Sequence, residues 1–192
     1  MQEEPATEGR QDQSGRRASQ VDLLIKIGEE VELFHSPDGT GYADVTINDH
    51  RETWPIRRPG FRRWLCRRFY DQAKGAPNSN AIQSALNVLE AHAQFDSPQR
   101  QTFIRVADCG EKLYLDLADL AWRAIEIDRE GWRIVEEPPV RFLRPAGMQP
   151  LPAPAAEGSV ESLQSYLNIS KENDFILVQI GSSSCVFLGS DK

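Results

Sequence analysis

The spacing of the apolar residues changes once along this chain, and that change constrains the fold more than any other feature of the sequence. Between residues 60 and 94, apolar residues recur every three or four positions, which is the period of an amphipathic helix. Between residues 102 and 136 they alternate with polar residues, which is the period of a strand with one buried face. The sequence therefore predicts an α+β fold in which antiparallel strands and hairpins pack on two central helices.

Two helices are expected in the first of these regions. The first follows Pro59 and covers about residues 60–74. The second covers about residues 80–94 and is capped by Asn78 or Ser79. A short loop joins the two helices, so a helical hairpin and a helix-turn-helix-like unit both fit the pattern. The apolar stripe of the first helix consists of Phe61, Trp64, Leu65 and Phe69.

Strands are expected on both sides of these helices. Residues 31–35 and 42–47 flank a stretch of turn-forming residues, so they predict a β-hairpin. Four more strands are expected from the alternating pattern, and they cover residues 102–106, 112–117, 122–127 and 131–136.

Composition divides the chain into four parts. Residues 1–20 contain almost nothing to bury and are expected to form a disordered tail. The α+β domain is placed at residues 21–144. Prolines are frequent in residues 145–158, which are expected to form an extended connector. Residues 159–192 are expected to form a short C-terminal segment that begins with one short helix.

The positive charge of the chain is concentrated in one segment. The chain has a net charge of −7, yet residues 51–75 contain eight basic and two acidic residues. Arginines on one helix surface can contact successive phosphates, and Trp64 or Tyr70 can stack on bases, so the segment predicts contact with DNA or RNA. An equally open alternative is that the arginines pair with acidic residues of the same protein. The predicted nucleic-acid-binding residues are Arg57, Arg58, Arg62, Arg63, Arg67 and Arg68.

Other candidate sites are weaker. The acidic residues Asp116, Asp119, Glu126 and Asp128 lie close in sequence and suggest a divalent metal site. Alternation places Asp116 and Glu126 on solvent-exposed strand faces and Asp128 in a turn, so no metal ligands are assigned. The three histidines share no catalytic motif, and no glycine-rich phosphate-binding loop is present, so neither catalytic residues nor a cofactor is predicted.

Cysteine content and hydropathy bear on the location of the protein. The three cysteines are widely separated and form no metal-binding motif, which favours a reducing compartment. No apolar run approaches the roughly 18 residues that a membrane-spanning helix needs. The expected location is cytoplasmic, without contact with a membrane.

Several segments resemble a known family. They read HSPDGTGYADVTINDHRETWPIRRPGFRRWL, GAPNSNAIQSALNVLEAHAQF, LYLDLADLAWRAIEI and GWRIVEEPPVRFLRPAGMQPLP. Within about residues 33–179, the chain resembles the upstream, non-catalytic region of P-loop ATP-binding proteins of prophages and other mobile elements, which are related to primase-helicases. The resemblance implies a module of a DNA replication protein whose partners are nucleic acid or another replication protein.

The resemblance stops before the nucleotide-binding domain of that family. After residue 179 the sequence reads IGSSSCVFLGSDK and contains no phosphate-binding loop, so the chain is expected to be truncated and not to be an enzyme. The apolar residues 175–178 and 186–188 would then promote self-association. The alternatives are a protein-interaction adaptor, a non-functional truncated remnant and, less favoured, a small metal-dependent enzyme.

Overall fold

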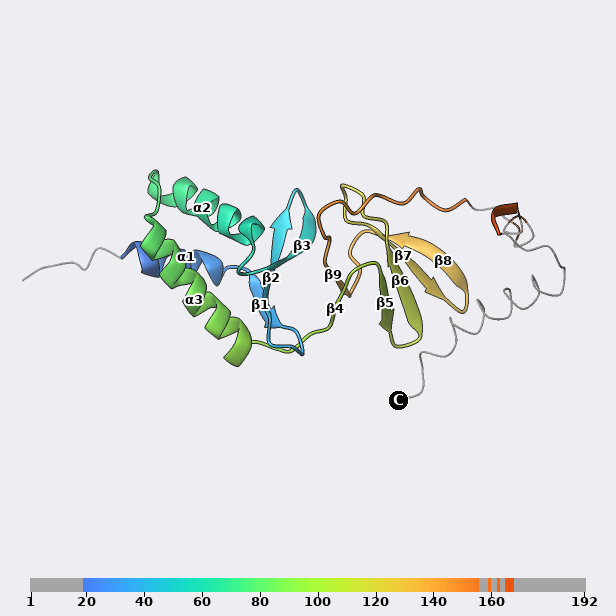
Figure 1. The fold of residues 1–192 in the computed structure, drawn as a ribbon, viewed down its shortest axis with the longest axis horizontal. Helices are drawn as coiled ribbons and strands as arrows, with labels where there is room; N and C mark the ends of the chain where they lie inside the picture. Colours follow the sequence, from blue (N-terminus) through green and yellow to red (C-terminus); the bar gives the residue numbers. More distant parts are fainter. Residues whose placement is uncertain (1–18, 156–158, 160–161, 163–164, 168–192) are drawn as a thin grey trace, which may run out of the picture.

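The computed structural model describes residues 19–155, 159, 162 and 165–167 and has two lobes (Figure 1). Residues 19–100, the helical lobe, contain all three described helices and a three-stranded sheet. Residues 101–151, the meander lobe, contain a four-stranded sheet. The predicted α+β class is confirmed. The expectations for residues 1–18, and most of those for the C-terminal segment, lie outside the described residues.

In the helical lobe, helices cover one face of the first sheet. The helices are α1 (Gln20–Gly28), α2 (Pro59–Ala73) and α3 (Ser79–Phe95). The antiparallel strands β1 (Glu32–His35), β2 (Gly41–Ile47) and β3 (His50–Pro55) form the sheet in the order β1-β2-β3. Helix α1 packs on α2 and α3, and α3 packs on β1 and β2. A Cβ atom at Gly28 would lie only 2.3 Å from Leu89, so glycine permits the close approach of α1 to α3.

The core of this lobe follows the predicted helical period. Phe61, Leu65 and Phe69 of α2 are all buried, and Trp64 packs against the same cluster from its edge. Asn78 caps α3, because its side-chain oxygen accepts a hydrogen bond from the backbone N–H of Ala81 at 2.8 Å. The period of 3.6 therefore identified both helices and the residues they bury.

Two elements of the helical lobe were not predicted, although each carries a local signal. Helix α1 begins with a capping box, in which the Ser19 side chain and the backbone N–H of Asp22 form a hydrogen bond of 3.1 Å. Strand β3 follows a two-residue turn in which Asn48 and Asp49 both have positive φ, 47° and 65°. Asparagine and aspartate adopt this conformation more readily than other non-glycine residues, so the pair marks a hairpin.

The meander lobe is built from adjacent antiparallel strands. These are β5 (Val106–Cys109), β6 (Lys112–Asp116), β7 (Ala124–Asp128) and β8 (Gly131–Val135). The predicted strand over residues 102–106 is divided, because β4 (Thr102–Phe103) leaves the sheet and pairs in parallel with β9 (Arg141–Phe142). A small core lies on one face of the meander and contains Ala107, Tyr114, Ala124, Val140 and Phe142.

The prediction of which face of the meander sheet lies in solvent was wrong. Asp116 and Glu126, expected in solvent, are only 1% and 6% exposed. Each is buried together with cations, since Arg144 binds Asp116 at 2.6 Å and Lys112 binds Glu126 at 2.8 Å. The expectation that the strands pack on helices is correct only for the first sheet. In the part of the chain that the structure describes, no helix lies against the meander (Figure 1).

A buried ion pair joins the two lobes. The Asp44 carboxylate of β2, only 3% exposed, accepts a hydrogen bond of 3.0 Å from Nε of Arg141 in β9 and one of 2.6 Å from the Thr53 hydroxyl. The Arg141 guanidinium also lies 6.0 Å from the centre of the Phe34 ring. On the same face, Arg51 donates hydrogen bonds to backbone carbonyls of the meander lobe. The first sheet is therefore held between the helices and β9.

We expect Arg141→Met to lower the free energy of unfolding by about 3 kcal/mol, because it leaves the Asp44 carboxylate buried without its main cation. Urea denaturation measures the change. The double variant Asp44→Asn/Arg141→Met should lose less stability than Arg141→Met alone. Arg129→Met, which removes an exposed pair with Glu111, serves as the control and should change stability by less than about 1 kcal/mol. Equal effects of Arg141→Met and Arg129→Met would contradict this role for the pair.

Candidate nucleic-acid interface

Helix α2 presents a cationic line to solvent. Its buried residues Phe61, Leu65 and Phe69 occupy one side, which is fixed by packing against α1 and β3. Residues spaced by three or four positions share a helix face, so four others form a line on the opposite side. All four are exposed, and they are Arg63, Arg67, Tyr70 and Lys74.

Three of the six predicted arginines pair with acidic residues of the same protein. Arg57 donates a hydrogen bond of 2.8 Å from Nε to Glu90 of α3, and this bond raises the pKa of Arg57 above its ordinary value. Arg68 lies 3.2 Å from Glu30 and Arg67 lies 3.3 Å from Asp71. The alternative of internal pairing is therefore correct for half of the set.

The remaining three arginines have no such partner. Arg58, Arg62 and Arg63 are exposed, and among the described residues none of them forms a side-chain hydrogen bond or ion pair. Lys74, at the C-terminal end of α2, is exposed and unpaired in the same part of the chain. Arg67 adds to this group, because its pair with Asp71 lies at the surface and its side chain is 74% exposed. These five residues, Arg58, Arg62, Arg63, Arg67 and Lys74, are called the α2 basic surface below.

Only one of the two candidate stacking residues, Trp64 and Tyr70, is available to a ligand. The Trp64 ring is stacked on Phe61 with 5.4 Å between ring centres, and it packs on the core, so it is not presented to a ligand. Tyr70 is 51% exposed and lies on the cationic line of α2. An exposed aromatic ring among cations is the arrangement that binds unpaired bases beside phosphates.

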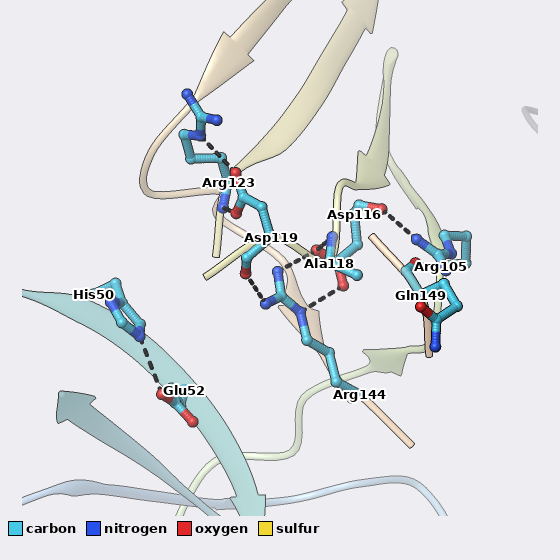
Figure 2. A network of polar contacts seen from close by, with 9 residues as sticks. All are labelled: His50, Glu52, Arg105, Asp116, Ala118, Asp119, Arg123, Arg144 and Gln149. Carbon is cyan, nitrogen blue, oxygen red and sulfur yellow. Dashed lines mark hydrogen bonds and ion pairs between the residues drawn. The ribbon is translucent and has the colours of Figure 1, made fainter. Parts of the chain in front are cut away.

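Arginines surround two of the acidic residues that suggested a metal site, Asp116 and Asp119 (Figure 2). Arg144 donates hydrogen bonds of 2.9 and 2.6 Å to the Asp116 carboxylate and lies 3.9 Å from the centre of the Trp122 ring. Asp119 accepts a hydrogen bond of 2.7 Å from Nε of Arg123. These pairs hold the loop between β6 and β7 in place, including Trp122, whose φ of 56° is uncommon for a tryptophan.

The described residues contain no cluster that could form a metal site. Within them, no three histidine, cysteine, aspartate or glutamate side chains lie close enough together to hold a metal ion. The histidines are separated and have structural contacts. Nδ1 of His35 is 2.9 Å from the Ala93 carbonyl, His50 is 3.0 Å from Glu52, and His92 is 3.1 Å from Glu29.

Comparison with known proteins leaves the function open. No protein-family model, no curated protein and no solved structure matches this chain. Among the described residues, no helix has the length and apolar character needed to cross a membrane.

The ion pairs of the β6–β7 loop predict a pH dependence of stability. Burial raises the pKa of Asp119, but hydrogen bonds from Arg123 and the charges of Arg123 and Arg144 outweigh burial, so the pKa lies below its ordinary value. A lowered pKa in the folded state stabilises the fold above the pKa of the unfolded chain, about 4, and this stability is lost as pH falls through the folded pKa.

We expect Asp119→Asn to lower the free energy of unfolding by about 1 kcal/mol at pH 7 and by progressively less below pH 4, because the carboxylate is then protonated. Urea denaturation across this pH range measures the difference. Asp108→Asn, at an exposed position, should have little effect on stability anywhere in this pH range. A difference for Asp119→Asn that stays constant down to pH 2 would contradict the assignment.

Proposed function

We propose that this chain is a non-catalytic module that binds nucleic acid through the α2 basic surface. One observation carries the proposal: Arg58 at the N-cap of α2, and Arg62 and Arg63 near the start of the helix, are exposed, and no acidic residue in the described part of the chain pairs with them. In a chain with a net charge of −7, such a group marks the place where an anionic partner is attracted.

The dimensions of α2 suit a polyanion. Lys74 follows Arg63 by eleven positions, which is about 16 Å along the helix axis at a rise of about 1.5 Å per residue. A nucleic-acid backbone presents several phosphates over that length, and each cation that meets a phosphate releases bound counterions, which favours binding. The acidic remainder of the protein repels the same backbone, so binding is expected only along α2.

The resemblance to the upstream region of mobile-element ATP-binding proteins supplies a context for this proposal. In that context the nucleic acid is DNA at a replication site. Catalysis then belongs to a partner or to another domain, and this chain contributes binding alone. A replication protein is the second kind of partner that the same context suggests.

The double variant Arg62→Glu/Arg63→Glu tests the interface, because both side chains are exposed and unpaired. Fluorescence anisotropy of labelled DNA should show at least a tenfold loss of affinity at low salt. The slope of log affinity against log salt should become shallower by about 1.5, because two phosphate contacts are lost.

A matched control separates local contact from net charge. Lys26→Glu/Arg129→Glu makes the same change in charge at exposed positions outside α2, in α1 and in the meander lobe, and it should retain most of the affinity. Circular dichroism should show that both variants fold. Equal loss of affinity in both variants, or none in Arg62→Glu/Arg63→Glu, would contradict the proposed interface.

The exposed Tyr70 ring predicts a preference for unpaired bases. Stacking of a base on an aromatic side chain contributes about 1–3 kcal/mol, so Tyr70→Ala should weaken binding to single-stranded DNA by about fivefold or more. Binding to a duplex should change by less than about twofold, because paired bases do not reach the ring. The same anisotropy titration with the two DNA forms measures this difference, and an equal loss for both forms would show that Tyr70 does not stack on a base.

A further inference from the structure

One face of the meander sheet is almost wholly apolar. The strand register aligns two rows of side chains across it. The first row is Val106, Leu115, Ile125 and Ile134. The second row is Asp108, Leu113, Ile127 and Trp132. Successive residues of a strand point to opposite faces, so seven of these eight positions place an apolar side chain on the same side of the sheet.

This apolar face is left partly open to solvent. Val106 is 56% exposed, Trp132 is 44% exposed and Ile134 is 36% exposed. The core of the lobe lies on the opposite face, around Tyr114 and Phe142. In the part of the chain that the structure describes, no helix packs on either row. Ile125, between the outer strands, is only 6% exposed, so the most exposed part of the face lies on β5 and β8. Exposed apolar side chains that share one face of a sheet mark a surface that another segment or molecule covers.

The chain leaves the meander lobe at one end of this face. The backbone N–H of Leu151 donates a hydrogen bond of 2.8 Å to the carbonyl of Leu117, which follows directly on β6. By alternation, Leu117 continues the line of Leu113 and Leu115 along that strand. Leu151 is itself 37% exposed. Leu151, within the proline-rich connector of residues 145–158, therefore lies beside the apolar face.

The segment beyond the connector contains apolar residues whose burial would be favourable. Tyr166 is 85% exposed. The sequence of the segment contains the apolar run 175–178, FILV. Seven connector residues, 152–158, reach up to about 23 Å when extended. Four strands spaced by about 4.8 Å are only about 14 Å across, so the tether permits the segment to reach any part of the face.

We propose that residues 168–192, through the apolar run 175–178, dock on the apolar face of the meander sheet within the same chain. A short tether keeps the segment at an effective concentration in the millimolar range, which favours docking within one molecule over association of two copies. Docking buries the two side-chain rows and the apolar residues of the segment together. This inference is independent of nucleic-acid binding, because none of its residues lies on α2.

A photo-crosslinker in the full chain tests the proposal. Benzoylphenylalanine replaces Ile134, and the protein is irradiated at a concentration at which it is monomeric. Mass spectrometry should find a cross-link within one chain between β8 and a peptide from residues 168–192. The same residue at Ser84, on an exposed position of α3, should give no such cross-link. Cross-links only between chains would show that a second copy covers the face, and no cross-link to residues 168–192 would equally overturn the proposal.

A second variant tests whether apolar contact drives the docking. With the photo-crosslinker at position 134, Phe175→Asp/Leu177→Asp should lower the yield of the cross-link at least fivefold, because it places two carboxylates against an apolar surface. Lys171→Glu, a change of charge outside the apolar run, should leave the yield nearly unchanged. An undiminished yield in Phe175→Asp/Leu177→Asp would overturn apolar docking.

Discussion

The burial of Asp44 is the constraint on which the arrangement of the two lobes depends. A carboxylate withdrawn from water is costly unless cations and hydrogen-bond donors surround it. Thr53 supplies one donor from the neighbouring strand, and Arg141 supplies the cation from a strand 97 residues further along the chain. The Asp44 carboxylate therefore has its main cation only when β9 lies against the first sheet. The two lobes are in this way held together by polar contacts, while each lobe has an apolar core of its own.

The pairing of arginines with acidic residues also distinguishes α2 from the rest of the surface. Arg141, Arg144 and Arg123 pair with Asp44, Asp116 and Asp119, and these three arginines therefore stabilise the fold. On α2, the unpaired arginines Arg58, Arg62 and Arg63 satisfy no acidic residue in the described part of the chain. An acidic protein that keeps unpaired cations on one helix is suited to an anionic partner at that helix, which is the basis of the proposed function.

The sequence predicted features whose causes are local. The spacing of Phe61, Leu65 and Phe69 identified α2 and its buried side, and Asn78 identified the start of α3. Helix α1 and strand β3 were missed, although the capping box at Ser19 and the turn at Asn48 mark them. The prediction of the exposed face of the meander failed for another reason. Alternation shows that a strand has two faces, but the element that covers one of them comes from elsewhere in the chain.

The pairing of the arginines could not be predicted either, because their partners are distant in the sequence. The contact of Arg57 with Glu90 spans 33 residues and that of Arg68 with Glu30 spans 38, so charge patterning within α2 did not distinguish them from Arg62 and Arg63. Only the folded arrangement divides the basic segment into structural and available side chains.

The most direct test of the central claim is hydrogen–deuterium exchange of the full chain with and without single-stranded DNA at low salt. If the α2 basic surface binds nucleic acid, peptides that cover residues 58–74 should become protected, and those of the meander lobe should not change. Protection confined to the meander lobe, with α2 exchanging at its original rate, would contradict the account.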